Sequence, residues 1–133
     1  MEEYKGSKIL FTSSHLFLFS SLFGFYIKNW NVSIGMMIVY LTSIYYHFRG
    51  GEKKKIIDMT SNIILGLYYS YGFYKRGTYL PGIIGIIVMS LYMGMKSIKD
   101  FGENHEMNHF IFIHIPIYLG FMYIHYEHLL SIL

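Results

Sequence analysis

Five long apolar runs constrain the fold of this sequence more than any other feature. Asp58 is the only charged residue in the stretches 9–27, 29–48, 56–74, 77–95 and 107–126. A bilayer core of about 30 Å is crossed by a helix of roughly 20 apolar residues. The pattern therefore predicts an all-α integral membrane bundle, a single domain over residues 1–133, with five transmembrane helices at about 8–27, 31–48, 56–74, 78–95 and 101–131.

The composition separates this chain from ordinary soluble domains. Hydrophobic residues make up 53% of it and charged residues only 14%, whereas soluble domains carry about 25% charged residues. The absence of cysteine excludes disulfides and thiolate metal sites. The net charge of +3 is concentrated in the predicted loops. Because no basic face is left for a nucleic acid, we expect no nucleic-acid partner.

Basic residues are distributed unevenly between the two predicted sides of the membrane. The side opposite the N-terminus holds Lys28, Lys75 and Arg76, and the N-terminal side holds Lys5, Lys8, Arg49, Lys53, Lys54, Lys55, Lys96 and Lys99. By the positive-inside rule, this multi-pass protein places its N-terminus at the cytoplasmic face. The first apolar run lacks a cleavage-site pattern and is predicted to remain as an uncleaved anchor.

Polar side chains able to bind metals or protons occur where three predicted helices meet this same side. Ser43 and His47 end the second helix, Asp58 begins the third, and His105 and His109 begin the last. Residues four apart share one face of a helix. Since polar groups at membrane depth are energetically costly, such a group of residues is a functional hypothesis by default.

These five residues match the requirements of a catalytic zinc site. Three imidazoles leave one open position on zinc, and zinc lowers the pKa of a bound water towards about 7. A carboxylate can take the proton of that water, and a hydroxyl can bond the water or a developing oxyanion. We therefore predict His47, His105 and His109 as Zn²⁺ ligands, with Ser43 and Asp58 as catalytic residues.

The last predicted helix contains two further features. Asp100 and Glu103 are expected to cap and begin it ahead of His105. His114 lies five residues after His109, about 140° round an α-helix, and is expected to point away from the predicted ligands. Pro116 is expected to kink the helix nearby.

The predicted site resembles the CREST superfamily, which includes alkaline ceramidases, progestin and adipoQ receptors and hemolysin III proteins. The shared pattern is S-x3-H, then Asp, then H-x3-H, which is present here as Ser43–His47, Asp58 and His105–His109. The step from His47 to Asp58 is most similar to the alkaline ceramidases. The resemblance implies a zinc-dependent amidohydrolase that cleaves a ceramide-like lipid amide, with the three histidines on zinc and Asp58 and Ser43 beside the water.

The chain departs from the CREST pattern in two places. The family has seven helices, and here only one helix, instead of three, separates the helix of Asp58 from the H-x3-H helix. The loss of two helices keeps the ends on the same side but removes walls of the lipid pocket. The acidic, Trp-containing calcium motif of the ceramidases has no match in residues 1–8, so calcium is not predicted.

Other interpretations fit the same residues. A non-catalytic membrane protein, receptor-like or structural, can retain such a metal site, and packed polar histidines explain His15, His125 and His128. A haem held between His47 and His109 is a further alternative, although it leaves Ser43 and Asp58 without a role. The expected partners are the lipid substrate and the bilayer. A second copy of the chain is a candidate partner because Gly82, Gly85 and Gly94 allow another helix to approach closely.

Overall fold

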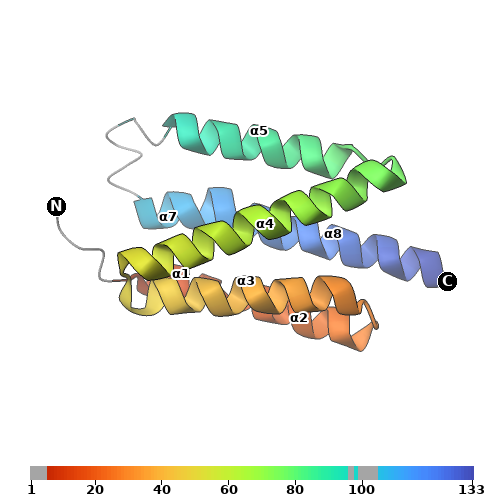
Figure 1. The fold of residues 1–133 in the computed structure, drawn as a ribbon, viewed down its shortest axis with the longest axis horizontal. Coiled ribbons are helices and arrows are strands. Elements are labelled where there is room, and N and C mark those ends of the chain that lie inside the picture. Colours follow the sequence, from red (N-terminus) through yellow and green to blue (C-terminus); the bar gives the residue numbers. More distant parts are fainter. Residues whose placement is uncertain (1–5, 96–97, 99–104) are drawn as a thin grey trace.

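The computed structural model of this chain describes residues 6–95, 98 and 105–133, and these residues form an all-helical bundle (Figure 1). The predicted all-α class is confirmed, with five helical segments in the described residues. Asp100, Glu103 and the predicted helix start at residue 101 lie outside them, as do Lys5, Lys96 and Lys99. The elements are α1 (Lys8–Ser13), α2 (His15–Tyr26), α3 (Trp30–Arg49), α4 (Glu52–Arg76), α5 (Leu80–Met95), α7 (His105–His109), η1 (Phe110–His114) and α8 (Ile115–Ile132).

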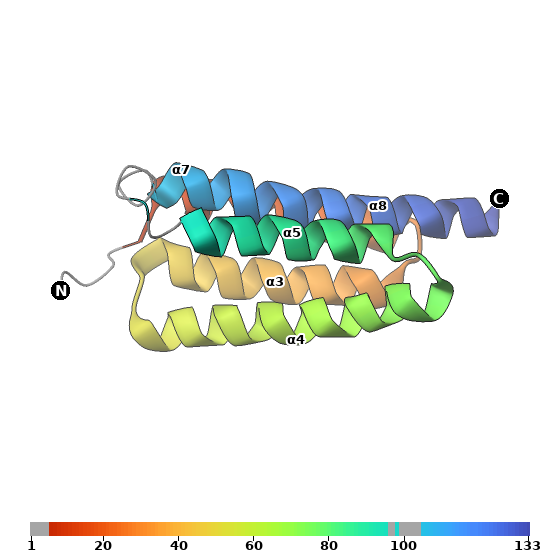
Figure 2. The ribbon, with the colours of Figure 1, turned by 90° about the horizontal axis from the view of Figure 1, so that it is seen from above.

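Two of the five segments are composite. α1 and α2 form one helix with a break at Ser14, where the hydroxyls of Ser13 and Ser14 both bond the carbonyl of Leu10. Such bonds from serine to a carbonyl three or four residues earlier often bend helices. α7, η1 and α8 form one continuous segment that runs the length of the bundle (Figure 2).

The core lies between α2, α3 and α8. Its buried side chains include Phe17, Met36, Val39 and Ile124. Small residues bring these helices close together, because a Cβ atom at Gly24 would meet the hydroxyl of Ser33 and the ring of His125. This close contact brings α2, α3 and α8 together and buries His125 between them.

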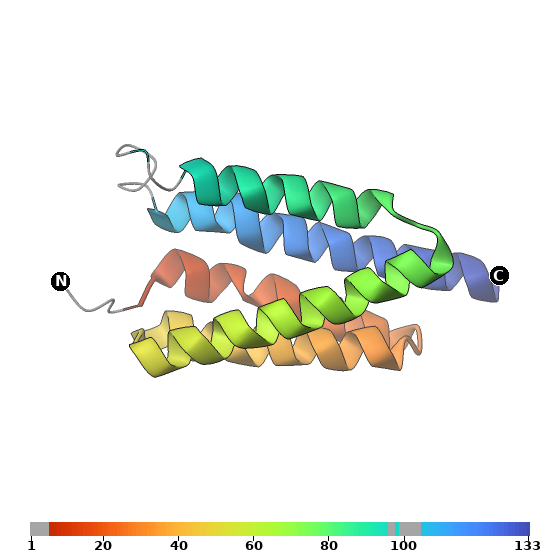
Figure 3. The same cartoon turned by 45° about the horizontal axis from the view of Figure 1, so that its top comes forward.

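α4 and α5 lie on the outside of this core, as Figures 1 and 3 show. Within α4 only Asp58 and Phe73 are buried. Within α5 only Tyr92 is buried, at 5% exposure. Both helices therefore present long rows of exposed apolar side chains.

Two segments of the described chain are long and apolar enough to cross a membrane, namely Lys8–Tyr26 and His105–Ile132. The helix Leu80–Met95 is apolar but shorter. The first and last predicted spans are thus supported by length and composition. The crossing of the membrane by all five segments stays a prediction.

Candidate metal centre

His47 is fixed at the end of α3 by the chain that enters α1. The Ser7 amide donates to the His47 carbonyl at 2.9 Å, and the Ser7 side chain caps α1 by accepting from the Leu10 amide. Gly6 lies so close that a Cβ atom there would meet the His47 and Phe48 carbonyls, and its φ of +96° favours glycine. The start of α1 is therefore packed directly on the end of α3, and His47 is only 1% exposed.

A π-helical turn places a second and a third histidine beside His47. η1 spans Phe110–His114, between α7 and α8. A π-turn takes in about one residue more than an α-turn, so a step of five residues returns nearly to the same face. His109 and His114 therefore lie together, with ring centroids 5.1 Å apart. The expectation that His114 points away from His109 is wrong, because it assumed an uninterrupted α-helix.

Pro116 explains why the helix departs from α-geometry at this point. It occupies the first turn of α8. Proline has no amide hydrogen to donate and clashes with the carbonyl four residues earlier, which here belongs to Phe112, inside η1. The sequence predicted a kink at Pro116, and the structure shows a π-turn at Phe110–His114 that precedes the proline.

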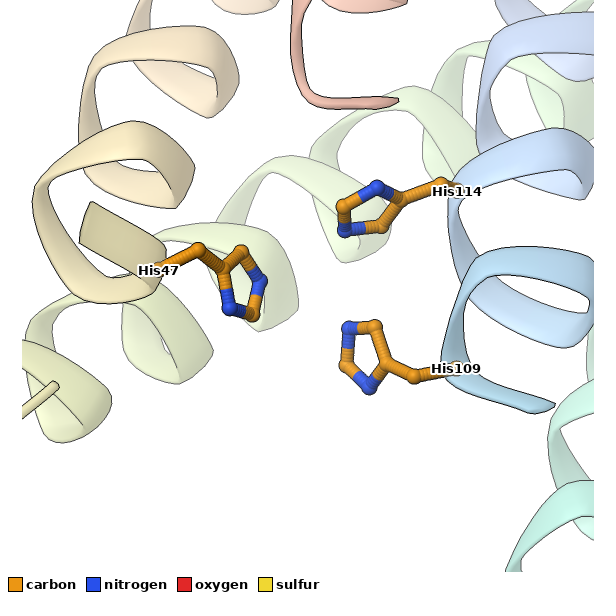
Figure 4. A group of neighbouring side chains, drawn as sticks. All are labelled: His47, His109 and His114. Carbon is orange, nitrogen blue, oxygen red and sulfur yellow. The ribbon is translucent and has the colours of Figure 1, made fainter. Parts of the chain in front are cut away.

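The three histidines His47, His109 and His114 form one compact group (Figure 4). Each offers one ring nitrogen, and these nitrogens all lie within 4.8 Å of one another. The ring centroid of His47 is 5.3 Å from that of His109 and 5.4 Å from that of His114. His47 and His114 are buried, whereas His109 is partly exposed. Figure 4 shows one nitrogen of each ring directed towards the space that the three rings share.

A buried serine orients the His114 ring. Ser13 Oγ lies 2.6 Å from His114 Nδ1 and 3.1 Å from the Leu10 carbonyl. Because a carbonyl can only accept, the single hydroxyl proton of Ser13 is used on Leu10, and Nδ1–H of His114 donates to Ser13. This tautomer leaves Nε2 of His114 with a free lone pair. Metal-binding histidines are commonly fixed in this way through their second nitrogen.

Tyr92 contacts the second nitrogen of His109. Its hydroxyl lies 3.3 Å from His109 Nδ1, and its ring centroid is 6.0 Å from that of His109. Since Tyr92 is the one buried side chain of α5, this contact also joins α5 to the rest of the bundle. Two of the three imidazoles, those of His109 and His114, therefore have an outer partner at Nδ1.

The donor set and its spacing suit zinc. Nitrogens bound tetrahedrally at about 2.0–2.1 Å from zinc lie about 3.4 Å apart, and the observed upper limit of 4.8 Å requires only small rotations of the side chains. Three histidines with one open position are a common ligand set of catalytic zinc. The group can thus hold a metal ion, as predicted, with His47 and His109 among its members.

His105 lies one turn from His109 and outside this group. Its ring centroid is 5.7 Å from that of His109, and the side chain is partly exposed. Sequence reasoning included His105 because H-x3-H is the α-helical spacing of two ligands, and it left out His114 for the same reason. The proline two residues after His114 was the available signal that α-helical spacing fails there.

Ser43 lies one turn before His47 and is 2% exposed. Its hydroxyl is 2.8 Å from that of Ser14, whose own proton goes to the Leu10 carbonyl at 2.6 Å. Ser43 therefore donates to Ser14, and its oxygen keeps acceptor capacity. This arrangement favours a role in accepting a hydrogen bond from water over a role as donor to an oxyanion.

Asp58 is buried at the contact between α3 and α4, at 6% exposure. The hydroxyl of Thr42 and the amide of Asn62 donate to it at 3.0 and 3.3 Å. Both of these bonds end on Oδ1, so the Oδ2 atom keeps its capacity to accept a proton or hydrogen bond. Thr42 precedes Ser43 in α3, which places the carboxylate beside the helix that carries Ser43 and His47.

Comparison with protein-family models, with curated proteins and with solved structures finds no match for this chain. The resemblance to the CREST superfamily therefore stays a prediction, supported by its motif residues alone.

Proposed function

We propose that this chain is a multi-pass membrane protein that binds zinc through His47, His109 and His114 and hydrolyses an amide bond of a membrane lipid. The observation that carries the proposal is the convergence of three imidazole nitrogens, from two helices remote in sequence, within 4.8 Å of one another. The CREST resemblance supports the reaction class and the ceramide-like substrate.

Helix lengths and exposed side chains support the membrane placement. The two apolar segments Lys8–Tyr26 and His105–Ile132 have 19 and 28 residues, and at about 1.5 Å per residue a helix of about 20 residues spans about 30 Å, the thickness of a bilayer core. Exposed residues of α4 include Ile63, Ile64 and Leu67, at 59–68% exposure. Contiguous apolar surface of this kind is rare on soluble monomers and normal in lipid. Arg49 and Lys53 lie at the end of the bundle that holds the metal centre. By the positive-inside rule, such basic residues favour the placement of that end at the cytoplasmic face.

The chain's own polar groups supply what hydrolysis requires around the metal. Zinc bound to the three histidines would act as a Lewis acid that lowers the pKa of a water molecule. Asp58 is assigned as the proton acceptor because its carboxylate is buried and its Oδ2 atom retains acceptor capacity. Ser43 is assigned to hold the water by accepting a hydrogen bond from it. Both roles depend on groups already fixed by Thr42, Asn62 and Ser14.

Elemental analysis of the detergent-purified protein, followed by an assay with a ceramide that carries a fluorescent acyl chain, tests the proposal. We expect about one zinc per chain and hydrolysis of the amide. Asp58→Asn should retain zinc and lose hydrolysis by about 10²–10⁴-fold, the usual contribution of a general base. Thr60→Ala, on the exposed face of α4, is the matched control and should retain both.

The same measurements separate the alternatives. A protein that contains zinc but hydrolyses no lipid amide would support a receptor-like or structural role on the same site. A protein that binds no zinc, even after incubation with the metal, would overturn the metal centre and the hydrolase together. A Soret absorbance from the purified protein would favour the haem alternative instead.

A further inference from the structure

A cavity of about 800 Å³ lies at the end of the bundle remote from the metal centre. The start of α3 and the last halves of α4 and α8 line it. Its volume falls within the range of about 300–1,000 Å³ that is typical of small-molecule sites. Neither the metal ligands nor Ser43 and Asp58 belong to its lining, so the proposed hydrolysis leaves it without a role.

Exposed aromatic and basic side chains mark the depth of this cavity in the membrane. Tyr26, Trp30, Tyr74 and Tyr79 at this end of the bundle are 54–84% exposed. They lie close in sequence to the basic residues at helix ends, which are Lys28, Lys75 and Arg76. Aromatic residues with lysine or arginine are typical of the membrane–water interface. The cavity is therefore at the level of lipid headgroups.

Charges of both signs face the cavity. Arg76 ends α4 and lies 3.9 Å from Glu127 of α8, measured from Nη2 to Oε2. Oε2 of Glu127 is buried and has no hydrogen-bond partner among the described residues. Lys75 adds a second cation to the α4 side. This long ion pair leaves a buried carboxylate oxygen and two basic groups able to bind a ligand that carries both charges.

A tyrosine adds a donor on the same wall as the two basic residues. The amide of Asn31 donates to the hydroxyl of Tyr68 at 2.6 Å, and both residues line the cavity. Because the Tyr68 oxygen accepts this bond, its hydroxyl proton is available for an acceptor on a ligand.

We propose that this cavity binds the headgroup of a zwitterionic phospholipid. The phosphate lies on Arg76, Lys75 and Tyr68, since guanidinium groups bind phosphate with charge-assisted and often bidentate hydrogen bonds. The ammonium of the same headgroup donates to Glu127. A purely anionic headgroup is disfavoured because it leaves the Glu127 carboxylate facing another negative charge. This proposal depends on the membrane placement and is independent of the hydrolase chemistry.

Native mass spectrometry of the detergent-purified full chain, titrated with dioleoyl phosphatidylethanolamine or dioleoyl phosphatidylglycerol, tests the inference. We expect the zwitterionic lipid to bind at least about tenfold more tightly, which is the effect of one additional charge-assisted hydrogen bond. Glu127→Gln should remove this preference, and a Lys75→Gln/Arg76→Gln double variant should weaken the binding of both lipids. Lys53→Gln/Lys54→Gln, at the other end of α4, is the control and should bind as the unaltered chain does.

The comparison of the two lipids on the unaltered chain needs no variant and decides the question even if a variant misfolds. Equal affinity for the two lipids would overturn the inference, as would competition by inorganic phosphate alone at millimolar concentration. Zinc content measured on the same samples keeps the two proposals separate, because it reports on the metal centre at the opposite end.

Discussion

The bundle contains two buried histidine environments, in opposite halves, that differ in what the ring nitrogens contact. His125 is fully buried, and its Nε2 lies 2.9 Å from the Ser20 carbonyl. The Asn29 amide nitrogen lies 3.2 Å from its Nδ1. Because the carbonyl can only accept, Nε2 carries the proton and Nδ1 accepts from Asn29. Both nitrogens of this neutral ring are thus used within the protein fold.

His114 is equally buried but uses only one nitrogen in this way. Its Nδ1 bonds Ser13, and its other nitrogen is directed at His47 and His109 (Figure 4). The Nε2 lone pair of His114 is therefore available to a cation placed among the three rings. Burial of a histidine in this bundle therefore does not by itself indicate function, because His125 and His114 are both buried. The partner of the second nitrogen distinguishes a structural histidine from a ligand.

The largest expected difference is between His114→Ala and His105→Ala. Zinc sites bind with about 10–16 kcal/mol shared among four ligands, so loss of His114 should weaken zinc binding by roughly 10²–10³-fold. His105→Ala should leave the affinity unchanged because His105 lies outside the three-nitrogen group. Competition with a chromophoric chelator measures both. If His105→Ala releases zinc and His114→Ala does not, the ligand set read from H-x3-H is the correct one.

The sequence predicted the general position of this site but not its full ligand set. Apolar runs defined the helices, and the alternation of their ends placed His47 and the start of the last helix on the same side. The structure brings His47 and His109 together as that argument requires. His114 could not be placed, because helical periodicity assumes a constant number of residues per turn and the π-turn at Phe110–His114 changes it.

The side-chain hydrogen bonds around the site could not be predicted from the sequence either. No role at the site was assigned to Ser13 or Ser14 from the sequence. Their hydrogen bonds to His114 and Ser43 depend on the break between α1 and α2 and on how closely α1 packs against α3. Such distances follow from tertiary packing, and a single sequence has no local pattern that encodes them.

Ser13→Ala tests the orienting bond to His114. Loss of an outer-sphere partner commonly weakens metal affinity by about 10–100-fold, and the same chelator competition measures it. Ser20→Ala is the matched control, because Ser20 is also a buried serine of the first helical segment and its hydroxyl has no partner among the described residues. Equal zinc affinity in the two variants would show that the Ser13 bond does not orient the ligand.

His125→Phe tests the structural side of the comparison. The phenyl ring retains the shape of the imidazole and leaves the Ser20 carbonyl and the Asn29 amide without their partner. We expect the free energy of unfolding to fall by about 2–4 kcal/mol, with zinc affinity unchanged. Unfolding by SDS in mixed micelles measures the stability. A loss of zinc without a loss of stability would show that the two histidine environments are coupled, contrary to the comparison.

The smallest effect is expected from packing beside His125. A methyl group at Gly24 would meet Ser33 Oγ and the His125 ring, and overpacking of this kind destabilises by about 1–3 kcal/mol. Gly85→Ala is the control, because nothing lies within 4 Å of its added Cβ atom, and a compatible helical Gly→Ala change stabilises by about 0.4–1 kcal/mol. The two variants should therefore shift SDS unfolding in opposite directions. A shift in the same direction would mean that α2, α3 and α8 do not pack as closely around His125 as the structure shows. That result would contradict the assignment of His125 as a structural histidine and, with it, the contrast to His114.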